Sequence, residues 1–127
     1  MTPMPHVPVS WGELIDKITI LEIKVERLRQ PDAVANARHE LALLLTALGP
    51  ADAELDQLRR ALGAVNRSLW DIEDRIRRKE AHQEFDADFI ALARAVYRSN
   101  DERARIKREI NLLLRSAIIE EKQYVQY

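Results

Sequence analysis

Polar and aromatic side chains recur at helical spacing in two stretches of the second half of this sequence. The first stretch carries Asn66, Trp70, Glu73, Arg77 and Glu80, and the second carries Tyr97, Asn100, Lys107 and Asn111. If both stripes face one groove, these convergent groups could form a ligand-binding or catalytic site. The other interpretation is a solvated flank of ion pairs between residues three or four apart, such as Glu73 with Arg77.

Arg103 interrupts an otherwise mostly aliphatic row, where a charge is costly unless a carboxylate and hydrogen bonds meet it. The candidate carboxylates are Glu73 and Asp74, or Asp16 and Glu22. In one interpretation, Arg103 belongs to a buried polar layer that specifies the register between helices. In the other, its planar fork of donors binds a carboxylate or phosphate ligand between helices.

The candidate ligand-binding residues all have polar or aromatic side chains, and we expect them to suit an anionic small molecule. They are Lys17, Trp70, Glu73, Arg77, Tyr97, Asn100, Arg103 and Lys107. Arginines interleave with each acidic stretch, which favours an anion over Mg²⁺. The sequence has no cysteine, no glycine-rich phosphate loop and no Ser/His/Asp arrangement, so the catalytic residues are unknown. His6, His39 and His82 share no ligand spacing, and we expect neither a metal site nor a cofactor.

Composition narrows the class of protein. The chain has 127 residues, enough for one domain, and a formal net charge of -1. This balance argues against a non-specific nucleic-acid or membrane-surface binder. No stretch approaches the roughly 20 apolar residues of a membrane span, and the first residues do not resemble a signal peptide, so we expect a cytoplasmic protein.

The polar groups are predicted to lie on helices. Prolines in residues 1–9 indicate an extended arm, and residues 10–127 are predicted to form a single helical domain. Ser10 and Glu13 match a capping box, from which a first helix should run to about Arg29. Its apolar seam follows steps of three and four, yet Ile20 and Ile23 point to the opposite side. This helix should therefore be central in a bundle or covered by a second chain.

Three further helices are predicted. They span about Ala33–Leu48, Asp52–His82, and a start at Asp86 or Asp88 to about Ala117. The last two have seams with steps of three and four and are joined by a short turn, so they should form an antiparallel hairpin that brings Arg103 near Asn66. Gly63 within the third helix should cost about 1 kcal/mol relative to alanine. The predicted fold is all-α, with a long helical hairpin packed against a shorter N-terminal pair.

Long stretches of the sequence carry a family resemblance. "SWGELIDKITILEIK", "LWDIEDRIRRKE" and "FIALARAVYRSNDERARIKREIN", with a final "EEKQY", resemble an uncharacterised family of small bacterial and phage proteins. The resemblance covers nearly the whole chain except residues 33–49, and it implies no activity, cofactor or substrate. It implies family positions that are largely polar, including Asp16, Lys17, Trp70, Arg103 and Lys107. Trp11 departs from the family pattern, which has a small aliphatic residue there.

Two functional hypotheses follow. The first is a non-catalytic helical module that forms a homodimer or docks on another protein, because the first helix has two apolar faces and no nucleophile is evident. The second is an all-helical binder or enzyme for an anionic metabolite. The stretch "GELIDKITILEIK" is similar to the first helix of helical chorismate mutases, and Glu73, Asp74 and Glu80 could imitate the acidic sites of helical nucleotide pyrophosphohydrolases.

Overall fold

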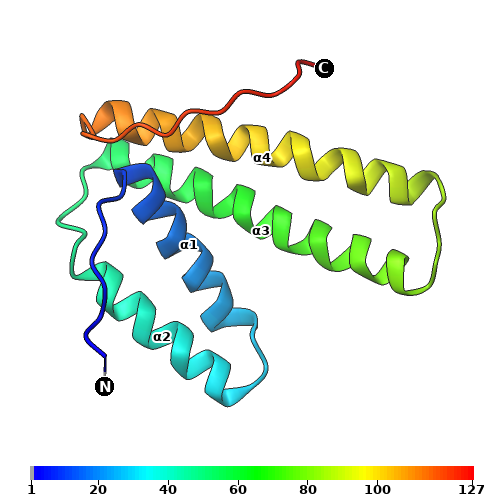
Figure 1. The fold of residues 1–127 in the computed structure, drawn as a ribbon, viewed down its shortest axis with the longest axis horizontal. Coiled ribbons are helices and arrows are strands. Elements are labelled where there is room, and N and C mark those ends of the chain that lie inside the picture. The colour runs from blue at the N-terminus through cyan, green and yellow to red at the C-terminus, as the bar shows by residue number, and fades with distance from the viewer. Residues whose placement is uncertain (1) are drawn as a thin grey trace.

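The computed structural model describes residues 2–127, so Met1 of the predicted N-terminal arm lies outside the described residues. Four helices follow one another along the chain: α1 (Trp11–Arg27), α2 (Pro31–Leu45), α3 (Ala53–Ala81) and α4 (Ala87–Leu113). The long helices α3 and α4 form an antiparallel hairpin, and the shorter pair α1–α2 packs at the open end of the hairpin (Figure 1). The predicted all-α fold is confirmed.

Helix α1 is the central element, because it packs against each of the other three helices. It lies between α2 and the hairpin (Figure 1). Ile15 and Ile18 have no exposed surface, and Ile23 on the other apolar face is 1% exposed. Helix α1 is therefore central in the bundle, while Ile20 on its second apolar face stays half-buried.

The core lies where α1 meets the hairpin. Ile15, Leu55, Leu62, Ile106 and Ile110 form one buried cluster from three helices. The steps of three and four on α3 and α4 bring these aliphatic side chains to one side of each helix. Burial of each such side chain stabilises the fold by about 1.5–3 kcal/mol. This cluster fixes the position of α1 against the hairpin.

The helix starts follow capping chemistry. The side chains of Ser10, Asp52 and Asp86 each accept a hydrogen bond from the backbone N–H three residues later, at 2.8–3.1 Å. Asp86, rather than Asp88, is therefore the N-cap of α4. Pro31 occupies the first helical position of α2, where its missing N–H is harmless, so this helix starts two residues earlier than predicted.

The helix ends fall short of the predicted ones. Helix α1 ends at Arg27, α2 at Leu45 and α4 at Leu113. After α4, Arg115 has a φ of 51°, a left-handed conformation that ends the helix. Residues 116–127 then form no helix and run back along α4 (Figure 1). We call this segment the C-terminal tail.

The part of the hairpin beyond α1 consists of two helices only. We call residues 70–81 of α3 and 87–99 of α4 the distal half of the hairpin. Ile72, Ile76, Phe89 and Val96 lie in its seam and are half-buried, whereas Leu62 and Ile110 under α1 have no exposed surface. A two-helix arm of this kind leaves apolar surface uncovered.

Candidate functional site

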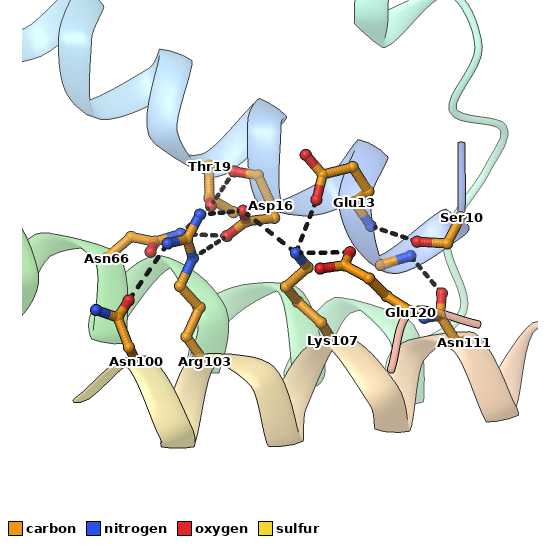
Figure 2. A network of polar contacts seen from close by, with 11 residues as sticks. Ser10, Glu13, Asp16, Thr19, Asn66, Asn100, Arg103, Lys107, Asn111 and Glu120 are labelled. Atoms are coloured by element: carbon orange, nitrogen blue, oxygen red, sulfur yellow. Dashed lines mark hydrogen bonds and ion pairs between the residues drawn. The ribbon is translucent and has the colours of Figure 1, made fainter. Parts of the chain in front are cut away.

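Asp16 is the centre of a polar network between α1, α3 and α4 (Figure 2). Its side chain is 1% exposed, and both of its carboxylate oxygens accept hydrogen bonds from Arg103 of α4, from Nε at 2.9 Å and from Nη2 at 2.5 Å. Asn66 of α3 donates to Asp16 at 2.9 Å and to the hydroxyl of Thr19 at 2.8 Å. The two-point Arg–carboxylate contact fixes the angle as well as the distance between α1 and α4.

Lys107 of α4 extends this network toward the N-terminus of α1. Its ammonium group donates to Glu13 at 2.7 Å and to Glu120 of the C-terminal tail at 3.3 Å, and it lies 3.9 Å from Asp16 (Figure 2). One turn further along α4, the side-chain oxygen of Asn111 accepts a hydrogen bond from the backbone N–H of Gly12 at 2.7 Å. Glu13 thus pairs with Lys107, and the observed half of the predicted capping box is the Ser10 hydroxyl that accepts from Glu13 N–H.

A glycine allows α1 and α4 to approach closely enough for these contacts. A Cβ atom at Gly12 would lie 2.5 Å from the backbone oxygen of Lys107 and 3.0 Å from the side-chain oxygen of Asn111. Any other residue would therefore push the start of α1 away from α4.

The network satisfies its own polar groups. Throughout residues 2–127, each buried side-chain nitrogen or oxygen has a hydrogen-bond partner. Burial acts to raise the pKa of Asp16, but hydrogen bonds from Arg103 and Asn66, with the charges of Arg103 and Lys107, hold the pKa below its ordinary value. Burial acts to lower the pKa of Lys107, but the hydrogen bond to Glu13 and the surrounding carboxylates raise it. At neutral pH, Asp16 is thus a carboxylate and Lys107 an ammonium, which suits a structural lock better than proton transfer.

The lowered pKa of Asp16 predicts a specific acid sensitivity. The native state binds this proton less readily than the unfolded chain, whose Asp16 has an ordinary pKa of 3.8, so the contribution is present above that pH and lost as pH falls through the native pKa. We expect the free energy of unfolding of Asp16→Asn, measured with denaturant below pH 3.8, to fall less steeply with pH than that of the wild type. Equal slopes for Asp16→Asn and the wild type would refute the assignment.

An open groove of about 460 Å³ lies beside the network, between α1 and α3. Its apolar lining comes from Ile20 and Ile23 of α1 and from Leu69 and Trp70 of α3. Its polar lining consists of Asn66, Glu73, Asp74, Arg77 and Arg103. Its two cations are already paired, Arg103 with Asp16 and Arg77 with Glu73 at 3.2 Å.

The structure divides the predicted ligand-binding residues among four places. Trp70, Glu73, Arg77 and Arg103 line the groove, and Asn100 accepts a weaker hydrogen bond from Arg103 at 3.4 Å. Lys107 lies one turn away in the buried network. Tyr97 packs on the C-terminal tail, and Lys17 is exposed on α1. The predicted proximity of Arg103 and Asn66 is correct, since both bind Asp16.

Sequence reasoning left Asp16 as one of four possible partners for Arg103, and it missed Thr19 and Glu120. A signal for Asp16 was present: at 100° per residue it shares a face with Thr19, Ile20 and Ile23, so the second apolar face of α1 buries it as well. Glu120 had no such signal, because nothing in the pattern of the tail indicates which helix it lies against.

Comparison with known proteins places the chain in a family. A family model described as a family of unknown function, DUF6165, matches residues 5–126. The chain belongs to this family. The match to DUF6165 spans all four helices and most of the C-terminal tail, and it confirms the predicted membership in an uncharacterised helical family. No curated protein and no solved structure is significantly similar to the chain. The similarities to helical chorismate mutases and to helical nucleotide pyrophosphohydrolases therefore stay predictions.

Two further features concern residues 2–127 of this DUF6165 member. None of its helices within that range is long and apolar enough to cross a membrane. The same residues include no cluster of three or more acidic, histidine or cysteine side chains arranged to hold a metal ion. Glu73, Asp74 and Glu80 therefore do not form such a cluster.

Proposed function

We propose that the protein is a non-catalytic helical module that self-associates through residues 70–81 of α3 and the adjoining groove. The proposal is supported by the groove, which has an apolar lining and, within residues 2–127, no unpaired cation. Ile20, Ile23, Leu69 and Trp70 supply an apolar lining, while its cations already have carboxylate partners. An apolar centre with a paired polar rim is typical of protein–protein interfaces.

The pairing of the groove's arginines with carboxylates argues against the alternative function, which is binding of an anionic metabolite. Trp70, Arg77 and Arg103 do line one groove and could contact a carboxylate or phosphate. However, an incoming anion would have to compete with Asp16 for Arg103, and Asp16 is buried and held in place. It would also meet the carboxylates of Glu73 and Asp74 at the rim. Electrostatics therefore favours a protein surface over an anion in this groove.

The charge order of α3 supports a second copy as the partner. Within residues 71–79, the acids come first and the bases second: Asp71, Glu73 and Asp74, then Arg75, Arg77, Arg78 and Lys79. A two-fold axis that packs α3 antiparallel against α3 of another copy brings each acidic half opposite a basic half. Around an axis at residue 75, Glu73 of each copy lies opposite Arg77 of the other. A parallel arrangement would place like charges together.

Complementary charge reversals test this arrangement. We expect Glu73→Arg and Arg77→Glu each to shift the protein toward monomer in sedimentation velocity, because each places like charges opposite each other at the two-fold axis. A 1:1 mixture of the two variants should regain the dimer, since both cross-axis pairs are then opposite in charge. Arg94→Glu, an exposed change on α4, serves as the control and should keep the wild-type distribution. Unchanged masses for the single variants, or a mixture that stays monomeric, would contradict the proposal.

A further inference from the structure

The C-terminal tail occupies the outer surface of α4 without joining the helical bundle (Figure 1). It is anchored at its start by Ser116, whose N–H donates to the backbone oxygen of Asn111 at 2.8 Å. Beyond that point, a pair of glutamates contacts two basic residues of α4. Glu120 accepts from Lys107 at 3.3 Å, and Glu121 accepts from Arg108 at 2.9 Å.

The far end of the tail makes an aromatic contact. The rings of Tyr127 and Tyr97 meet edge to face with their centroids 5.0 Å apart, and the Tyr127 hydroxyl donates to Asp101. Between the two anchor points, a hollow of about 330 Å³ remains at the surface of α4. Arg105, Lys107 and Arg108 contribute basic groups to its lining.

The tail is a poor fit to the surface that it covers. Tyr124 is 68% exposed and Val125 is 91% exposed, so these side chains gain little from docking. Exposed ion pairs such as Glu121 with Arg108 contribute little to stability, because water and salt screen them. A segment held by few, solvated contacts opens at a low free energy. The basic groups and Tyr97 beneath it are therefore accessible to a competing segment of the same chemistry.

We propose that the outer surface of α4 is a binding site for an extended acidic segment of another protein, and that the C-terminal tail occupies this site in cis as a built-in competitor. The tail defines the chemistry of the ligand: two adjacent glutamates against Lys107 and Arg108, and an aromatic ring six residues later against Tyr97. The site lies on α4 and not on the distal half of α3, so it is independent of the proposed self-association.

A labelled peptide with the sequence of residues 116–127 is the probe, and fluorescence anisotropy measures its affinity for full-length chains. The tail-weakened variant Glu120→Gln/Glu121→Gln should bind the peptide at least about 10-fold more tightly than the wild type. The wild-type tail competes because a short tether gives it an effective concentration in the millimolar range. The matched control Gln123→Lys/Gln126→Lys adds two positive charges to the tail but keeps both glutamates, and it should bind as weakly as the wild type.

A second substitution locates the site. Arg108→Glu, added to the tail-weakened variant, should reduce peptide affinity about 10-fold or more, and circular dichroism should show unchanged helix content because Arg108 is exposed. Three outcomes would each overturn the proposal: no binding to the tail-weakened variant, equal affinity for wild type and tail-weakened variant, or binding that survives Arg108→Glu. None of them would alter the masses expected for the Glu73 and Arg77 variants.

Discussion

Arg103→Met is expected to lower the free energy of unfolding by about 3 kcal/mol, as measured by denaturant titration at neutral pH. The reason is that the substitution removes the main hydrogen-bond partner of the buried Asp16 carboxylate. Asp16 is 1% exposed and loses its two-point partner, so a buried carboxylate keeps only Asn66 and the more distant Lys107. Removing one member of a buried ion pair costs more than the pair itself contributes, because the remaining charge stays desolvated.

The same substitution two residues away is the control. Arg105 also pairs with two carboxylates, Glu102 and Glu109, but these pairs lie on the exposed side of α4. Arg105→Met should change the free energy of unfolding far less than Arg103→Met does, because water screens the exposed pairs of Arg105. The double variant Asp16→Leu/Arg103→Met should recover much of the loss, since the buried carboxylate is then removed together with its partner and Lys107 keeps Glu13. Equal effects of Arg103→Met and Arg105→Met would show that the Asp16 network does not lock α1 to α4.

Gly12→Ala is expected to destabilise the fold by about 2–3 kcal/mol. The added Cβ would lie 2.5 Å from the backbone oxygen of Lys107, and a backbone atom cannot move aside as the end of a flexible side chain can. Relief of the clash requires α1 to move away from α4, which weakens the hydrogen bond from Gly12 N–H to Asn111. Thermal and denaturant unfolding would measure the effect.

Gly63→Ala is the matched control, and its effect should have the opposite sign. A Cβ at Gly63 meets no atom closer than 3.7 Å, the distance to Nη1 of Arg67, and so makes only ordinary contacts. Alanine also favours the helix by up to about 1 kcal/mol over glycine. Stabilisation by Gly63→Ala together with loss from Gly12→Ala would separate close helix approach from helix propensity. A Gly12→Ala variant as stable as the wild type would contradict the geometry at the α1–α4 contact.

The sequence predicted the helices well because their signals are local. Apolar steps of three and four, an N-cap at Ser10 and a proline after α1 depend only on neighbouring residues. The hairpin register followed from its short turn, which placed Arg103 near Asn66. The sequence could not predict that α1 docks with Gly12 against Lys107, because a close approach between helices depends on the shape of both partners.

The polar network was only partly predictable for the same reason. Arg103 interrupts an aliphatic row, and from this position the sequence predicted a carboxylate partner. That prediction is correct, because Arg103 binds Asp16. The choice of Asp16 over Glu22, Glu73 and Asp74 depends on where α1 sits across the hairpin, which is a tertiary property. The docking of the C-terminal tail on α4 depends on a left-handed Arg115 and on scattered surface ion pairs, neither of which has a periodic signal.

Sedimentation equilibrium of the wild-type protein over a wide range of concentrations tests self-association most directly. For a self-associating protein, the apparent mass should rise with concentration from the 14.7 kDa of one chain toward twice that value. An apparent mass that stays at 14.7 kDa at every concentration would contradict the proposed function.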